Sequence, residues 1–110
     1  MRIMNLTKRC SISDQAKLAV TFFDRMTGLL NKNNPRSLVF YTRFGLHTFG
    51  LSNPIDIILL DNSNRVVKLT KDLGPNRFFF YNPLFRIVIE LPKGSIDRSG
   101  TALNDKIKFE

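Results

Sequence analysis

The sequence predicts a mainly β domain, a compact jelly-roll-like sandwich or small barrel of short strands with one short helix near its N-terminal third. The apolar residues are mostly Phe, Ile, Leu and Val with no Trp, and branched and aromatic side chains favour strands. Clusters of Asn, Asp, Gly, Pro and Ser divide them into short runs, which is typical of all-β sandwiches and barrels. A chain of 110 residues has the length of one domain, so we expect residues 1–110 to share one core.

The first third of the chain combines short strands with the predicted helix. A weak alternation predicts a strand over residues 2–8, and the polar residues of 11–14 are typical of a turn that ends it. A short apolar piece follows at 17–20. Thr21 can cap a helix over 22–30, because its hydroxyl can accept a hydrogen bond from a backbone amide of the first turn.

The middle of the chain predicts the centre of the sheet. Residues 37–41 form an almost unbroken apolar run, which is typical of a strand buried on both faces. A second strand begins after Pro54, and its alternate side chains face opposite sides of the sheet. One side holds Ile55, Ile57 and Leu59, and the other holds Asp56, Ile58 and Leu60. Residues 61–64 then predict a turn, because Asp and Asn tolerate left-handed backbone, and 65–70 returns as the hairpin partner.

Turn signals also divide the C-terminal third. A turn is predicted at 72–76, followed by an aromatic strand at 77–81 and another strand at 85–91. We expect a single helical turn at 95–99 and a last short strand at 106–109. Glu90 falls late in its strand, where a surface or capping role is the simplest interpretation.

The net charge raises the question of an anionic partner. Seventeen Lys and Arg against nine Asp and Glu give a net charge of +8. Clustered bases would indicate nucleic acid or an anionic membrane surface. Here the bases lie singly from Arg2 to Lys108, with one adjacent pair at 8–9, so a solvated basic surface is the favoured interpretation and nucleic-acid binding an alternative.

The aromatic residues of 78–81 bear on the same question, because Arg77 and Arg86 flank them and aromatic rings can stack on single-stranded nucleic acid. A strand sends Phe78 and Phe80 to one face and the other two rings to the opposite face. At most half of the rings should therefore be exposed, and core packing is the favoured interpretation.

Other classes of protein are disfavoured. No stretch approaches the ~20 apolar residues of a membrane span, and the first residues lack the apolar run of a secretory signal, so we expect a soluble cytoplasmic protein. Cys10 is the single cysteine and cannot form an internal disulfide. Without a Cys-His cluster we expect no metal site and no cofactor.

The candidate site lies in the stretch 46–61, which holds the single His. Asp56 shares a strand face with two aliphatic side chains, where an unpaired carboxylate is costly. Its partner is open among Arg25, His47 and the backbone amides of 50–53. The favoured interpretation is that Asp56 fixes that loop. The alternative is a polar pocket that gathers Arg25, His47, Thr48 and Asp56 around a ligand.

Catalysis by the same residues is a further alternative. A carboxylate can orient a His that acts as a general base, so a small hydrolase using His47 and Asp56 is conceivable. No nucleophile-elbow pattern surrounds Thr48 or Ser52, however. A metal site at His47 would need a tighter set of ligands than the nearby acids supply.

An ordered series of short motifs runs from about Ala19 to Phe109. Its members are Thr21-Phe22-Phe23, Arg25, Gly28-Leu29-Leu30, His47-Thr48-Phe49-Gly50-Leu51, Pro54-Ile55-Asp56, Leu60-Asp61, Arg65-Val66-Val67, Leu73, Pro75, Arg77, Glu90-Leu91-Pro92, Gly94 and Asp105. The series resembles the family of the domain of unknown function 192, in its branch with a His-Thr-Phe-Gly-Met signature.

Two positions depart from that pattern. Leu51 stands where the branch has Met, which is nearly volume-neutral. Asn104 stands where it has Gly, and Asn tolerates a positive φ well enough to preserve a turn. The resemblance implies a compact, mainly β fold of jelly-roll type with a helix on one side. It implies no reaction.

Together these observations predict a small binding or interaction module. Its shallow polar site would lie near His47 and Asp56 and would take a polar ligand or a partner protein. A hydrolase and a nucleic-acid-binding protein are the alternatives.

Overall fold

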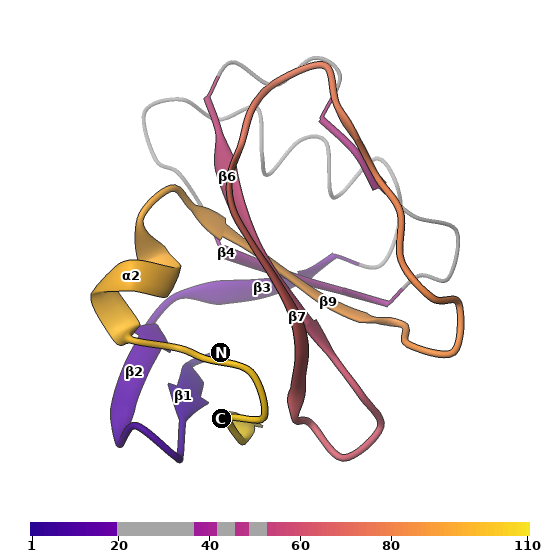
Figure 1. Ribbon diagram of the computed structural model, residues 1–110. Coiled ribbons are helices and arrows are strands. Elements are labelled where there is room, and N and C mark those ends of the chain that lie inside the picture. The colour runs from indigo at the N-terminus through magenta and orange to yellow at the C-terminus, as the bar shows by residue number, and fades with distance from the viewer. Residues whose placement is uncertain (20–36, 42–45, 49–52) are drawn as a thin grey trace.

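The computed structural model describes residues 1–19, 37–41, 46–48 and 53–110, which form a mainly β domain (Figure 1). An open five-stranded sheet has the order β3-β4-β9-β6-β7, with β3 and β4 parallel and the other neighbours antiparallel. Its strands are β3 (Ala16–Ala19), β4 (Ser37–Tyr41), β9 (Ile87–Pro92), β6 (Ile55–Leu60) and β7 (Val66–Leu73).

Two smaller sheets accompany it. A three-stranded sheet has the order β10-β1-β2, with β1 (Ile3–Asn5) between β10 (Ile107–Phe109) and β2 (Cys10–Ser13). The third sheet pairs β5 (Leu46–His47) with β8 (Phe78–Phe79). None of these sheets closes on itself among the described residues, so the mainly β class is confirmed and the small barrel that the sequence allowed is wrong.

Two clusters of apolar side chains cover opposite faces of β6. The larger core joins β6 and β9 to the three-stranded sheet and the helix, and includes Ile58, Leu60 and Ile96. The smaller core includes Ile55, Ile57 and Leu59 on the other face. The predicted alternation along β6 is therefore confirmed, and it turns Asp56 toward the side of the larger core.

Local turn chemistry acts as the sequence predicted. Asp61 Oδ1 accepts hydrogen bonds from the amides of Ser63, at 2.8 Å, and Arg65, at 3.0 Å. Asn64 has a φ of 60°, in the left-handed region that Asn tolerates. Asn104 has a φ of 71°, so the residue that replaces Gly does adopt the turn conformation expected of it.

The positions of three predicted elements have different outcomes. The helical turn expected at 95–99 is confirmed as α2 (Ser95–Ser99), the helix that the described part of the chain contains. The predicted helix over 22–30 lies outside the described residues. The predicted turn at 11–14 is wrong in its first part, because Ser11 and Ser13 belong to β2, where Ile12 packs into the larger core.

Candidate functional site

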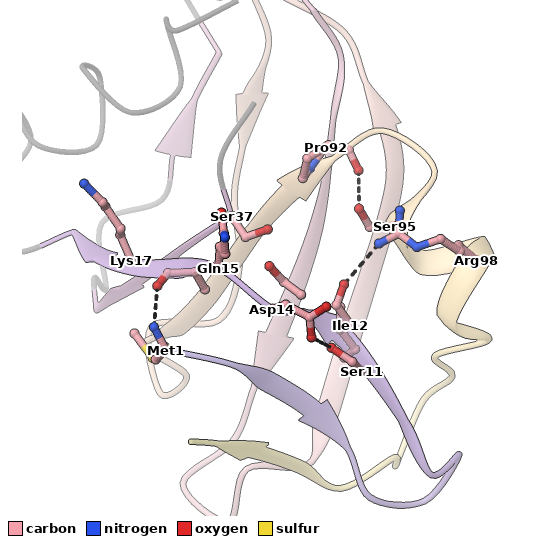
Figure 2. Close-up of a pocket in the computed structure, with 12 residues that line it drawn as sticks. Met1, Ser11, Ile12, Asp14, Gln15, Lys17, Ser37, Pro92, Ser95 and Arg98 are labelled. Carbon is pink, nitrogen blue, oxygen red and sulfur yellow. Dashed lines mark hydrogen bonds between the residues drawn. The ribbon is translucent and has the colours of Figure 1, made fainter. Parts of the chain in front are cut away.

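A cavity of about 750 Å³ lies where β2, the beginning of β3 and α2 meet (Figure 2). Residues 11–17 line one side, and Ser37, Pro92, Ser95 and Arg98 line the rest together with Met1. Hydroxyl, amide and charged side chains make up most of this lining, so the cavity suits a hydrophilic occupant better than an apolar one.

Hydrogen bonds across the cavity hold its walls in place. Arg98 Nη2 donates to the carbonyl oxygen of Ile12 at 3.1 Å, which ties α2 to β2 (Figure 2). Ser95 Oγ donates to the carbonyl oxygen of Pro92 at 2.6 Å, which ties the start of α2 to the end of β9. The Arg98–Ile12 bond joins residues 86 positions apart in the sequence, whereas the Ser95–Pro92 bond fixes the local turn between β9 and α2.

The charges around the cavity are mainly positive. Arg98 retains further N–H donors beyond the one that the Ile12 carbonyl accepts, because a guanidinium has five. Lys17 is exposed on β3 at the rim. Asp14 is the one acid in the lining, and it accepts a hydrogen bond from Ser11 Oγ at 2.6 Å and lies 3.7 Å from Arg2 Nε. An anionic group would meet more attraction than repulsion here.

Asp56 does not line this cavity, but it stabilises the helix that forms one of its walls. Its carboxylate is buried, with Oδ1 accepting from the amide of Asp72 and Oδ2 accepting from the amide of Ile96, both at 2.9 Å. Gly94, at the N-cap of α2, has no side chain to offer, so Asp56 supplies the missing acceptor to the first turn. Asp56 thereby positions the helix that carries Ser95 and Arg98.

Thr48 fastens the turn before β8. Its hydroxyl donates to the carbonyl oxygen of Gly74 at 2.7 Å and accepts from the amide of Arg77 at 2.9 Å. The backbone of Thr48 also bonds to Arg77 and Asn76, and the side chain is buried. Both capacities of the hydroxyl are thus engaged within the fold.

The structure describes the positions of three of the four residues predicted to share one site. His47 is in β5, opposite Phe78 of β8, and Arg25 lies outside the described residues. The β5–β8 pair lies at the opposite end of the molecule from β2 and α2 (Figure 1). Asp56 accepts a hydrogen bond from α2, and Thr48 is hydrogen-bonded to the turn at 74–77. A common site for all four residues stays a prediction.

Glu90 is a buried residue that the sequence interpretation placed wrongly. It is fully buried in β9, which has β4 on one side and β6 on the other, so no position in this strand is at a sheet edge. Its alternation with Ile89 puts it on the same face as Val88 of the smaller core. Across the part of the chain that the structure describes, no group of three or more His, Cys, Asp or Glu could hold a metal ion.

The comparisons with known proteins decide the family. The model of the family of the domain of unknown function 192, described as "Uncharacterized ACR", matches residues 4–109. The chain belongs to this family. The DUF192 resemblance inferred from the motif series is therefore confirmed, and the match extends it upstream of Ala19.

The relatives of this DUF192 protein match it over most of its length. It is 36% identical over 115 residues to a UPF0127 protein of Thermococcus sibiricus, covering 98% of this chain and 74% of the relative. It is 34% identical to a UPF0127 protein of Pyrococcus horikoshii, covering 97% of each. A crystal structure of a protein of unknown function from Novosphingobium aromaticivorans matches with a TM-score of 0.77 at 17% identity, covering 98% of this chain and 82% of that one. This structural match shows a likeness of fold alone.

Proposed function

We propose that this DUF192 protein is a binding module for a small anionic ligand, which occupies the cavity between β2, β3 and α2. The observation that carries the proposal is the lining of that cavity, which contains four serines together with the cations Arg98 and Lys17. Arg98 is already held by the Ile12 carbonyl, so little side-chain entropy is lost when its remaining N–H groups meet a ligand.

Binding fits this cavity better than catalysis. Its serines have no His or Cys beside them in the described lining, and Asp14, the one carboxylate there, is bonded to Ser11. A nucleophile needs a neighbouring base, and a general base needs access to the proton it removes. A hydrolase that uses His47 and Asp56 would have to act elsewhere. Its test is loss of turnover in His47→Ala across an esterase and phosphatase screen, with the fold retained.

The binding test is NMR titration of the folded protein with small carboxylates, inorganic phosphate and sugar phosphates. We expect amide shifts to concentrate in 11–17 and 95–98, and Lys17→Gln to weaken binding about fivefold, in line with the loss of one partly screened charge pair. Lys108→Gln is the matched control, because Lys108 has the same charge on β10 outside the cavity. Equal weakening by both variants, or shifts absent from both segments, would count against the proposal.

The same titration tests the site predicted around Arg25, His47, Thr48 and Asp56. A ligand bound there would shift amides of 46–56 and change the titration of the His47 imidazole. Asp56→Asn should alter that titration if the two side chains interact, and leave it unchanged if they do not.

Two further expectations, on the cellular location and on the connection of the strands, are also proposals. A cytoplasmic location agrees with the finding that no helix among the described residues is long and apolar enough to span a membrane. Cell fractionation tests it. The jelly-roll type of connection is supported by the antiparallel pairing of most strands, although β3 and β4 are parallel. An experimental structure of the complete chain tests it.

A further inference from the structure

The segment from β8 through the following turn exposes apolar side chains. Phe78, Phe80 and Leu84 are 60%, 69% and 73% exposed, whereas Phe79 is buried and Tyr81 half-buried. The predicted division of the aromatic run is therefore confirmed, and one face of it points to solvent. The rings of Phe78 and Phe80 stack with centroids 5.6 Å apart and planes 15° apart. We name Phe78, Phe80 and Leu84 the apolar tip.

The backbone around the apolar tip is held by specific contacts. Asn82 forms the turn, because its Oδ1 accepts from the amide of Leu84 and its carbonyl accepts from the amide of Phe85, both at 3.0 Å. Lys68 Nζ donates to the carbonyl oxygen of Phe80 at 3.2 Å. The exposure of these apolar side chains is thus built into a fixed segment.

Positive charge accompanies the apolar tip. From Leu73 to Ile89 the sequence contains no Asp or Glu, while Arg77 and Arg86 are both exposed. The ammonium group of Lys68 lies 4.8 Å from the centre of the Phe79 ring. Exposed apolar side chains in a segment that carries cations and no acids complement a partner that has an anionic surface over an apolar interior.

We propose that the apolar tip docks this protein on an anionic lipid bilayer, with Phe80 and Leu84 entering the boundary between headgroups and acyl chains. Arg77 and Arg86 then contact lipid phosphates. Single-stranded nucleic acid fits less well. Leu84, the most exposed of the three, offers no ring for a base to stack on, and Phe78 and Phe80 cover one face of each other.

The test is co-sedimentation with lipid vesicles at low ionic strength. We expect the protein to bind vesicles of phosphatidylcholine with phosphatidylglycerol, and to bind pure phosphatidylcholine vesicles much less. Replacing Phe80 and Leu84 together by Ser should reduce binding by roughly tenfold or more through lost apolar burial. Replacing Arg77 and Arg86 together by Gln should reduce binding by roughly tenfold as well, through lost attraction to lipid phosphates.

Matched variants control for general effects of charge and hydrophobicity. Leu103→Ser removes another exposed Leu, and Arg9→Gln removes another exposed Arg; both lie outside the apolar tip, and both should leave vesicle binding unchanged. Because the native chain has no Trp, Phe80→Trp supplies a single reporter, whose emission should shift to shorter wavelength with anionic vesicles. Leu103→Trp should show no such shift.

Three outcomes would overturn the proposal. The first is no binding to anionic vesicles by the folded wild type. The second is equal binding by the Phe80/Leu84 double Ser variant. The third is binding to a single-stranded oligonucleotide that depends on Phe80 while vesicle binding does not. All these variants lie outside the cavity lining, so their results are independent of the ligand proposed for it.

Discussion

Asp105 is a buried carboxylate that is held in its charged form. Asn5 Nδ2 and the amide of Ala102 each donate to Oδ2 at 2.9 Å, and Lys8 Nζ lies 3.3 Å from Oδ1. Burial by itself would raise the pKa of this carboxyl. The hydrogen bonds from Asn5, Ala102 and Lys8, with the charge of Lys8, outweigh it and hold the pKa below its ordinary value.

The lowered pKa of Asp105 predicts a stability loss in acid. Its contribution to the free energy of unfolding is fully present above the unfolded pKa of about 3.9 and is lost as pH falls through the lower folded value. Urea unfolding from pH 7 to pH 2 should show a steeper loss for the wild type than for Asp105→Asn. Asp14→Asn, at an exposed carboxyl, is the control and should retain the steep loss. Parallel curves for wild type and Asp105→Asn would contradict this assignment.

The stability of the fold should also depend on both carboxylate oxygens of Asp56. In Asp56→Asn the amide NH₂ replaces one carboxylate oxygen, so the amide of either Asp72 or Ile96 loses its acceptor. We expect a loss of about 1–3 kcal/mol in the free energy of unfolding, measured by urea denaturation. Asp97→Asn, at an exposed position of α2, should cost less than Asp56→Asn, because its contact with Lys71 is a surface ion pair.

Thr48 offers a test that preserves side-chain shape. Thr48→Val removes the hydroxyl that serves Gly74 and Arg77, and should destabilise the fold by about 1–3 kcal/mol. Thr48→Ser keeps the hydroxyl and should lose less. Thermal unfolding of the two variants checks this order, and a Val variant as stable as the wild type would contradict it.

Individual side chains show where sequence reasoning succeeds and stops. The face that Asp56 occupies follows from strand alternation, which is local, and was predicted. Its partners were not, because Asp72 and Ile96 lie 16 and 40 residues away in the sequence. One signal was available: Gly94 before α2 cannot cap the helix, so an acceptor had to come from elsewhere. The burial of Glu90 needed knowledge that β9 has neighbours on both sides.

Among the elements, turns were predicted better than edges of sheets. The turn at 61–64 is decided by Asp61 and Asn64 themselves, so its chemistry is readable in the sequence. Residues 10–13 form β2 against their local preference, because pairing with β1 and burial of Ile12 outweigh the turn tendency of Ser. The predicted helix with Arg25 lies outside the described residues, so that part of the candidate site is still a prediction.

The start of α2 should be sensitive to a methyl group. Gly94 has a φ of 91°, so Gly94→Ala should cost about 1 kcal/mol or more through backbone strain, although the added Cβ would meet no atom within 4 Å. Gly74 also has room for a Cβ and no such φ, so Gly74→Ala should be neutral or slightly stabilising. Chemical denaturation of both variants provides the comparison, and equal effects would refute the strain argument.

Taken as a whole, the molecule brings its first and last strands together. The backbones of Arg2 and Glu110 exchange two hydrogen bonds of 2.8 Å, and β1 lies between β2 and β10. The cavity is likewise assembled from segments scattered between Met1 and Arg98, which no local pattern could have announced. Composition and turn signals predicted the class of the fold, whereas the pairing of β1 with β10 and the assembly of the cavity depend on contacts between residues distant in the sequence.

During synthesis on the ribosome, the adjacency of β1 and β10 imposes an order of events. β1 emerges first and can find β2 at once, but its other edge has no partner until a segment about one hundred residues later has left the exit tunnel. Until then the nascent chain presents an open strand edge and an incompletely covered larger core. The three-stranded sheet is thus completed only after β10 has been synthesised.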